Sequence, residues 1–141
     1  MLFDPNVWGP QYWFVLHTIA HSYPLTPNSV TKRKYYDFIQ NLPLFIPNSE
    51  IGSKFSELLD KYPVSPYLDN RDSFIRWMFF IHNNVNIILG KEQLLFEEAN
   101  DAYYANYKPK PVYLAEKFRI QKHYIYFALI LSCILLIYMY Y

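Results

Sequence analysis

Residues 69–90 read DNRDSFIRWMFFIHNNVNIILG and contain the longest helical pattern in this chain of 141 residues. Apolar side chains recur there every three or four positions, as they do on the buried face of an amphipathic helix. These positions are Phe74, Met78, Ile81, Val85 and Leu89. Asp69, Asn70 and Asp72 suit the start of a helix, and Gly90 suits the position just beyond its end. The stretch therefore predicts a long helix that packs one face against a core.

Four further helical patterns flank this stretch, most of them bounded by capping residues or prolines. They cover residues 4–22, 28–42, 47–61 and 92–105. The pattern in 47–61 has an apolar stripe formed by Ile51, Phe55, Leu58 and Leu59. In 28–42 the residues expected to face inward are Val30, Phe38, Ile39 and Leu42. No stretch of useful length alternates as a strand would, so we expect an all-α fold, a compact bundle of four to five helices over residues 1–106.

The C-terminal part of the chain predicts a linker followed by a membrane anchor. Residues 107–123 begin with Lys108-Pro109-Lys110-Pro111, which favours an extended linker, and end in a basic juxtamembrane segment. Residues 124–141 carry no charge and would span roughly 27 Å as a helix, enough for a thin bilayer. Arg119, Lys122 and His123 flank this run, so the positive-inside rule places residues 1–123 on the cytosolic face. The alternative, a buried helix of a soluble protein, is disfavoured because the run has no polar face.

Charge and cysteine content exclude several classes of function. Residues 1–116 carry 10 basic and 12 acidic side chains, which is not the charge pattern of a nucleic-acid-binding domain. The single cysteine, Cys133, lies inside the apolar run, so residues 1–141 cannot form an intrachain disulfide. His17 and His21 have the spacing of a metal-binding pair, but no acidic residue accompanies them. We therefore expect no metal site.

Two islands of sequence carry a resemblance to a known family. The first is Trp8-Gly9-Pro10 with Trp13 and His17, and the second is His82-Asn83-x-Val85-Asn86. In this order and at this separation they resemble the Erv/ALR family of FAD-dependent sulfhydryl oxidases, over roughly residues 5–105. The compact length is similar to that of versions carried by large DNA viruses. The resemblance implies a five-helix fold that binds FAD and commonly dimerises.

The resemblance also implies a set of cofactor-binding residues. Trp8, Gly9, Trp13 and His17 would line one side of the flavin. His82, Asn83, Val85 and Asn86 would hold the adenine and ribose side, with Lys91 near the phosphates. Without the resemblance, the same tryptophans and histidines are read as ordinary core residues. The cofactor prediction is therefore either FAD or none.

One departure from the family pattern decides the expected chemistry. The family has a Cys-x-x-Cys pair at the start of its third helix, and here the aligned positions are Asn48 and Ile51. Phe55 and Tyr62-Pro63 keep the expected spacing, so the helix itself is retained. Neither Asn48 nor Ile51 can form a thiolate, so we assign no catalytic residue. We expect Ile51 to continue the apolar stripe, which would convert the former site to packing.

Two functions from different classes remain open. The first is a catalytically degenerate scaffold, anchored in a membrane, that contacts protein partners. In a large icosahedral DNA virus these would be capsid proteins overlying an internal membrane, and the chain would be a minor capsid or inner-membrane protein. The second is an FAD-binding thiol oxidoreductase component that relies on a partner's cysteines. A third alternative is a heterodimer subunit that regulates an active paralogue through the family's dimer surface. A homodimer is also compatible with the sequence, and no nucleic-acid partner is expected.

Overall fold

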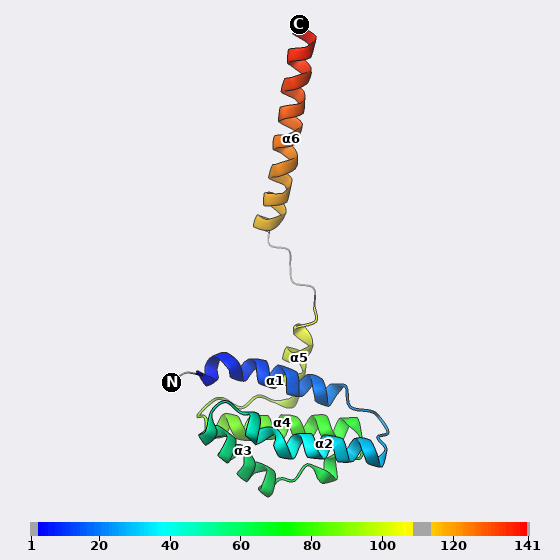
Figure 1. The fold of residues 1–141 in the computed structure, drawn as a ribbon, viewed down its shortest axis with the longest axis vertical. Helices are drawn as coiled ribbons and strands as arrows, with labels where there is room; N and C mark the ends of the chain where they lie inside the picture. Colours follow the sequence, from blue (N-terminus) through cyan, green and yellow to red (C-terminus); the bar gives the residue numbers. More distant parts are fainter. Residues whose placement is uncertain (1–2, 109–113, 141) are drawn as a thin grey trace. The chain divides into compact units, whose positions relative to one another are not determined.

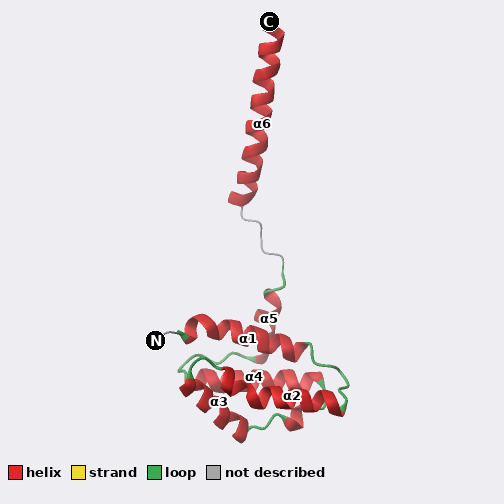
Figure 2. Ribbon diagram, viewed as in Figure 1, coloured by secondary structure: helices red, strands yellow, loops and turns green. Residues whose placement is uncertain are grey.

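The computed structural model describes residues 3–108 and 114–140, and every regular element within these ranges is a helix. The α-helices are α1 (Pro5–His21), α2 (Ser29–Asn41), α3 (Ser49–Lys61), α4 (Arg71–Ile88), α5 (Phe96–Ala105) and α6 (Leu114–Tyr140). Two 3-10 turns, η1 (Leu42–Phe45) and η2 (Ser65–Tyr67), complete the set (Figures 1 and 2). The predicted all-α class is thus confirmed. The chain divides into two compact units, Met1–Asn106 and Tyr107–Tyr141.

The core of the first unit lies where α1 and α3 pack against α4. Its buried side chains are Leu16, Ala20, Tyr23, Ile39, Leu42, Phe55, Leu58, Leu59, Val64, Leu68, Phe74, Trp77, Met78, Ile81 and Val85. The polar atoms of the two largest are satisfied. The Tyr23 hydroxyl donates to the Leu68 carbonyl at 2.8 Å, and the Trp77 indole donates to the Tyr62 carbonyl at 3.1 Å. The apolar stripe predicted for α4 therefore forms the centre of the bundle.

Three residues expected to face inward do not. Val30 and Phe38 on α2 are 64% and 39% exposed, and among the residues of α2 only Ile39 is buried. The reason is that α2 turns Tyr35 and Ile39 toward the core, where Tyr35 contacts Tyr23 and Phe74, so Val30 and Phe38 lie beside the covered stripe. Leu89 is 37% exposed because it follows the last turn of α4 and borders a cavity instead of the core.

Gly52 brings the first turn of α3 against η1. A Cβ atom at this position would lie 2.8 Å from the Pro43 carbonyl oxygen, closer than real Cβ atoms come to backbone. The helix begins just before this contact at Asn48, whose side chain accepts hydrogen bonds from the backbone N–H groups of Glu50 and Ile51. The close contact fixes the N-terminus of α3 against η1, and Ile51 in this first turn borders the site described below.

The chain reverses direction after α4 at Gly90, which has a φ of 66°. Lys91 N–H donates to the Asn86 carbonyl and Gly90 N–H to the Ile87 carbonyl, a pattern that ends a helix at a left-handed glycine. The start of the next helix was expected at residue 92, and this is wrong. Residues 91–95 are non-helical, and α5 begins at Phe96, where the Glu98 carboxylate accepts from Leu95 N–H.

The second unit contains α6, which starts well before the uncharged run. Residues 114–123, expected to belong to a linker segment, are helical, consistent with a stretch that lacks proline and glycine. Within α6, residues Gln121–Tyr140 are long and apolar enough to cross a membrane, with a mean hydropathy of 1.8. The extended linker predicted at Pro109 and Pro111 falls outside the described residues.

Candidate functional site

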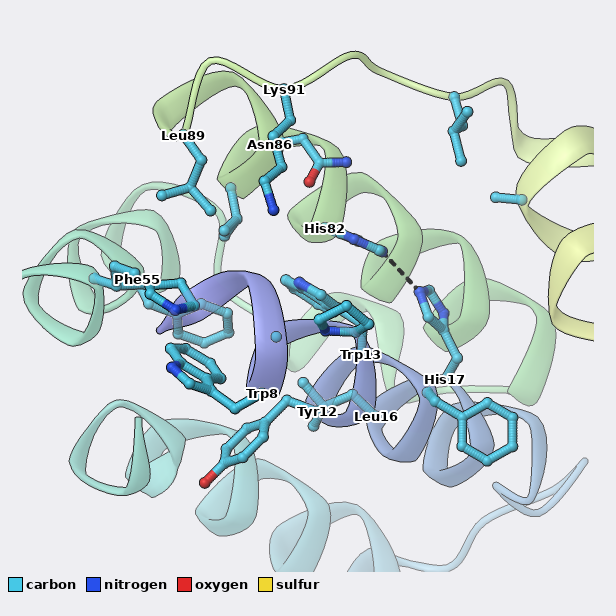
Figure 3. A pocket seen from close by; sticks show the side chains of 18 of the residues that line it. Trp8, Tyr12, Trp13, Leu16, His17, Phe55, His82, Asn86, Leu89 and Lys91 are labelled. Carbon is cyan, nitrogen blue, oxygen red and sulfur yellow. Dashed lines mark hydrogen bonds between the residues drawn. The ribbon is translucent and has the colours of Figure 1, made fainter. Parts of the chain in front are cut away.

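A cavity of about 400 Å³ opens between α1, α3, α4 and the segment that leads into α5 (Figure 3). Helix α1 supplies aromatic rings and α4 supplies polar and apolar groups, while α5 contributes small side chains. The lining residues include Trp8, Gly9, Tyr12, Trp13, His17, Ile46, Ile51, Phe55, His82, Val85, Asn86, Leu89, Lys91, Leu94, Ala99, Ala102, Tyr103 and Asn106. The walls are mainly apolar with a few polar groups, which is the usual composition of a small-molecule site.

The cavity gathers eight of the nine residues predicted to bind a cofactor. Trp8, Gly9, Trp13, His17, His82, Val85, Asn86 and Lys91 all line it, although they come from two helices and a turn far apart in sequence. Figure 3 shows Asn86 and Lys91 on the same side of the cavity. Asn83 is not among the lining residues, and its amide instead pairs with the backbone of Leu94. Its contact with a cofactor therefore stays a prediction.

Two histidines and a tryptophan join α1 to α4 at the cavity wall. His17 Nε2 lies 3.0 Å from His82 Nδ1, so one ring donates a hydrogen bond and the other accepts it. The ring of His82 stacks on Trp13, with centroids 3.9 Å apart and planes 10° from parallel. Trp13 also contacts Phe55 of α3 at 6.5 Å between centroids. These contacts give the wall a fixed, planar aromatic surface (Figure 3).

Burial holds both histidines in the neutral form. Desolvation, reinforced by the positive charge that His21 would carry, lowers the pKa of His17 from 6.5 to about 4. Desolvation, with smaller contributions from His17 and Lys91, lowers the pKa of His82 to about 3. A hydrogen bond between two imidazoles also requires at least one of them to be unprotonated at the shared nitrogen. The pair is therefore a neutral hydrogen-bonding element near pH 7.

The stability of the first unit is expected to fall as the pH drops below 6.5. The unfolded histidines bind protons near that value, whereas the folded pair resists protonation until about pH 4 and 3. The stabilisation is therefore complete above pH 6.5 and is lost toward pH 4, by on the order of 3 kcal/mol for each histidine. Denaturant unfolding at a series of pH values measures this change in the free energy of unfolding. The double variant His17→Gln/His82→Gln serves as the reference, because it lacks the two histidines and keeps the carboxylates. Parallel pH curves for the two proteins would contradict the expectation.

Trp8 carries an unsatisfied polar atom. Its indole Nε1 is buried and has no hydrogen-bond partner among the described residues. Its ring lies edge-on to Tyr12, with centroids 5.1 Å apart, and Tyr12 in turn donates to the Phe45 carbonyl at 3.0 Å. A buried N–H without a partner costs about 1–3 kcal/mol, so such a group usually serves a ligand or an ordered water. A ligand with a hydrogen-bond acceptor would satisfy it.

The two positions aligned with the family's cysteines have different roles here. Asn48 caps α3 through hydrogen bonds of 3.0 Å to Glu50 N–H and Ile51 N–H. Ile51 is only partly buried and lines the cavity, rather than joining the buried core residues Phe55, Leu58 and Leu59. The expectation that this site became core packing is therefore wrong. An apolar side chain borders the cavity at the place where the resemblance implies a thiol.

The sequence reading missed the wall formed by α5. Ala99, Ala102, Tyr103 and Asn106 lie on one helical face and border the cavity. The Tyr103 hydroxyl donates to Thr18 at 3.1 Å, and its ring stacks on His21 with centroids 4.4 Å apart. The pair of alanines three positions apart was a usable signal, because small residues on one face mark a close approach.

Comparison with known proteins extends these observations. The model of the Erv1 / Alr family matches residues 10–108. The probable FAD-linked sulfhydryl oxidase of Acanthamoeba polyphaga mimivirus is 32% identical over 108 residues, covering 76% of each chain. An FAD-linked sulfhydryl oxidase of African swine fever virus is 31% identical over 96 residues, covering 68% of this chain and 79% of the viral one.

The fold is also found among solved structures. The FAD-binding domain of Erv1 from Saccharomyces cerevisiae superposes with a TM-score of 0.64 and 24% identity, over 75% of this chain and 95% of that one. The yeast Erv1 core gives a TM-score of 0.63 at the same identity. At this identity the likeness establishes the fold alone. Because the family model covers more than half of the residues and the viral relatives cover more than two thirds, the chain belongs to the Erv1/Alr family.

Proposed function

We propose that this protein is a membrane-anchored, FAD-binding member of the Erv1/Alr family that has lost its own dithiol chemistry and serves as a scaffold. One observation carries the proposal. The cavity is retained, with eight of the nine predicted cofactor residues on its walls, while Ile51 borders it where the family has a cysteine.

The residues of the cavity fit a flavin. Trp13 and His82 present a flat stacked surface to a planar ring system, and the buried N–H of Trp8 offers a donor to a ring acceptor. Asn86 supplies an amide and Lys91 an ammonium group, which suit a ribose and a phosphate respectively. When bound, a flavin supplies a two-electron redox centre. The chain's own residues bind and orient it, and none of them forms a thiol pair to reduce it.

Thiol chemistry is absent from the first unit because no cysteine is present there. The single cysteine, Cys133, lies in α6 within the span Gln121–Tyr140. An apolar membrane environment disfavours a thiolate, which is the reactive form. Residues 1–141 acting alone therefore lack the dithiol that such an oxidation needs, which supports a structural role for the bundle.

A membrane scaffold also accounts for the second unit. We propose that α6 spans a bilayer and that Arg119 and Lys122 keep the first unit on its cytosolic face. Several relatives come from large DNA viruses, which supports a position on the internal membrane of a virion beneath a capsid shell. The partners in this setting would be capsid proteins, and the chain would be a minor structural component.

The absorption spectrum and oxygen uptake of the purified protein test the proposal. The full chain in detergent is expected to be yellow, with the visible bands of an oxidised flavin at about one flavin per chain. With dithiothreitol it is expected to consume oxygen no faster than free FAD at the same concentration. A folded but colourless protein would refute flavin binding, and oxygen uptake above the control would refute the loss of thiol chemistry.

A second candidate is a flavoprotein component that depends on a partner's cysteines. It is favoured by the position of Ile51, which lines the cavity at the exposed N-terminus of α3, where Ser49 and Glu50 face solvent. A partner's dithiol approaching this end would reach the cavity wall. Mixing the protein with a cysteine-bearing family member tests this idea. A rate of oxygen uptake above the sum of the two separate rates would favour the partner-dependent function over the scaffold.

A further inference from the structure

One wall of the cavity depends on a short segment, Lys91–Leu95, that we call the strap. It leads from the chain reversal at Gly90 to the start of α5 and lacks regular secondary structure. Lys91 and Leu94 from the strap line the cavity, and α5 continues the same wall. The position of this wall therefore follows from how the strap is held against α4.

The side-chain amide of Asn83, on α4, holds the strap by hydrogen bonds to both backbone polar groups of Leu94. Its Nδ2 donates to the Leu94 carbonyl at 2.9 Å, and its Oδ1 accepts from the Leu94 N–H at 3.3 Å. This paired arrangement imitates the hydrogen bonds between two strands. The side chain of Leu94 then faces the cavity, although Asn83 itself does not line it.

The rest of the wall is held by side-chain contacts of α5 with α1 and α4, among them the stacking of Tyr103 on His21 and the Arg76 guanidinium over the Phe96 ring. Helix α5 contains no fully buried residue. Its contacts with the bundle include an edge-on pair between Phe79 and Phe96, with centroids 5.4 Å apart, and the hydrogen bond from Tyr103 to Thr18. Segments with little buried apolar surface open locally at low free-energy cost. Within the strap itself, the two hydrogen bonds from Asn83 to Leu94 tie the chain directly to α4.

We propose that Asn83 is a positioning residue for the ligand site, which acts through Leu94 to keep the strap and α5 closed over the bound ligand. The part of the proposal that concerns affinity rests on the FAD binding proposed above. For a ligand that needs the closed wall, the apparent dissociation constant is the intrinsic one divided by the fraction of molecules in which the wall is closed. Loosening the strap is expected to raise the rate of ligand release more than to slow its binding.

The neighbouring Asn84 provides a matched control. Its amide donates to the Phe80 carbonyl of its own helix at 2.8 Å, and within residues 3–108 no hydrogen bond joins its side chain to the strap. Asn83→Ala and Asn84→Ala remove the same chemical group from adjacent positions of α4. Asn83→Asp is a third variant of nearly the same shape. It retains an acceptor for Leu94 N–H but sets a carboxylate oxygen against the Leu94 carbonyl. If Asn83 only filled space, this substitution would have no effect, whereas a hydrogen-bonding role predicts that it loosens the strap.

Amide hydrogen exchange on the full chain in detergent, without added FAD, tests whether Asn83 holds the strap and α5 in place. Asn83→Ala and Asn83→Asp are expected to speed exchange in residues 91–106 by about tenfold, with the remainder of the bundle unchanged. Asn84→Ala is expected to leave exchange in this region as in the wild type. Unchanged exchange in both Asn83 variants, or equal acceleration in the Asn84 variant, would overturn the proposal.

FAD binding measured by fluorescence tests the effect on the site. The dissociation constant is expected to rise by about tenfold in Asn83→Ala and Asn83→Asp, mainly through faster release, and to stay unchanged in Asn84→Ala. Wild-type affinity in the Asn83 variants would overturn the role in positioning. If the wild-type protein binds no FAD, the proposed function fails, and the exchange experiment still decides whether Asn83 holds the strap.

Discussion

Replacing Asn48 and Ile51 together by cysteine is expected to give the protein a dithiol oxidase activity. The substitution supplies the pair of thiols that residues 1–141 lack. Dithiothreitol would be oxidised to its disulfide, and oxygen would accept the two electrons and two protons to form hydrogen peroxide. We expect turnover to rise from background to as much as about 1 s⁻¹, the low end of ordinary enzymes. Oxygen uptake by the flavin-loaded variant, with dithiothreitol as the donor, measures the change.

The geometry at the start of α3 supports this expectation. Asn48 is the N-cap, and its side-chain oxygen lies 3.0 Å from Ile51 N–H, so the side chain at position 48 already folds back over position 51. Ile51 lines the cavity, which places a sulfur at that position on its wall. Thiols at a helix N-terminus have a lowered pKa because the helix dipole favours the thiolate. Loss of the Asn48 cap costs about 1 kcal/mol, which a folded bundle tolerates.

The double serine variant, Asn48→Ser/Ile51→Ser, is the matched control. It introduces small polar side chains at the same two positions without sulfur, and serine also restores the cap. Each single cysteine variant lacks a disulfide partner and is expected to remain inactive. A double cysteine variant that binds flavin and still shows no turnover would contradict the prediction. That outcome would mean that more than the thiol pair has been lost from this member of the family.

The sequence predicted the helices of the bundle well because their signals are local. The stripe of α4, the Asn48 cap and the reversal at Gly90 each depend on residues within a few turns of one another. The buried face of α2 was overestimated because periodicity shows which residues can face a core. It does not show which of two neighbouring stripes another element covers, and in α2 the covered stripe contains Tyr35 and Ile39. Whether Val30 and Phe38 are buried or exposed therefore depends on how the helices pack, which the local sequence does not determine.

The site was predictable only in part for a similar reason. Trp13 and His17 share a face of α1, and His82 and Asn86 share a face of α4, so each pair follows from helical spacing. Their meeting depends on how α1 packs along α4, which the family resemblance implied and the spacing alone does not. The roles of Asn83 and of α5 follow from the chain reversal at Gly90, which returns the strap along α4. Such a pairing leaves no periodic trace in the sequence.

Trp77→Ala is expected to cause the largest loss of stability of any single truncation in the first unit, about 4 kcal/mol. The indole is 2% exposed and stacks on Phe74, with centroids 6.1 Å apart. Its Nε1 donates to the Tyr62 carbonyl at the end of α3, so truncation leaves both a cavity and an unpaired carbonyl oxygen. Although Trp77 lies only five residues before His82, it belongs to the core and does not line the cavity.

Trp77→Phe separates the two contributions, because it keeps an aromatic ring in the core and removes only the donor and part of the volume. Its expected cost is about 1–2 kcal/mol. Thermal unfolding of the full chain in detergent, followed by circular dichroism, measures both variants. Since 1 kcal/mol corresponds to roughly 4–8 °C for a unit of this size, Trp77→Ala is expected to lower Tm by at least about 15 °C. If both variants melted within a few degrees of the wild type, the packing of α4 against the end of α3 would not support the bundle. The rigid placement of His82 and Asn86 on the cavity wall would then need another cause, because both side chains are carried by that same helix.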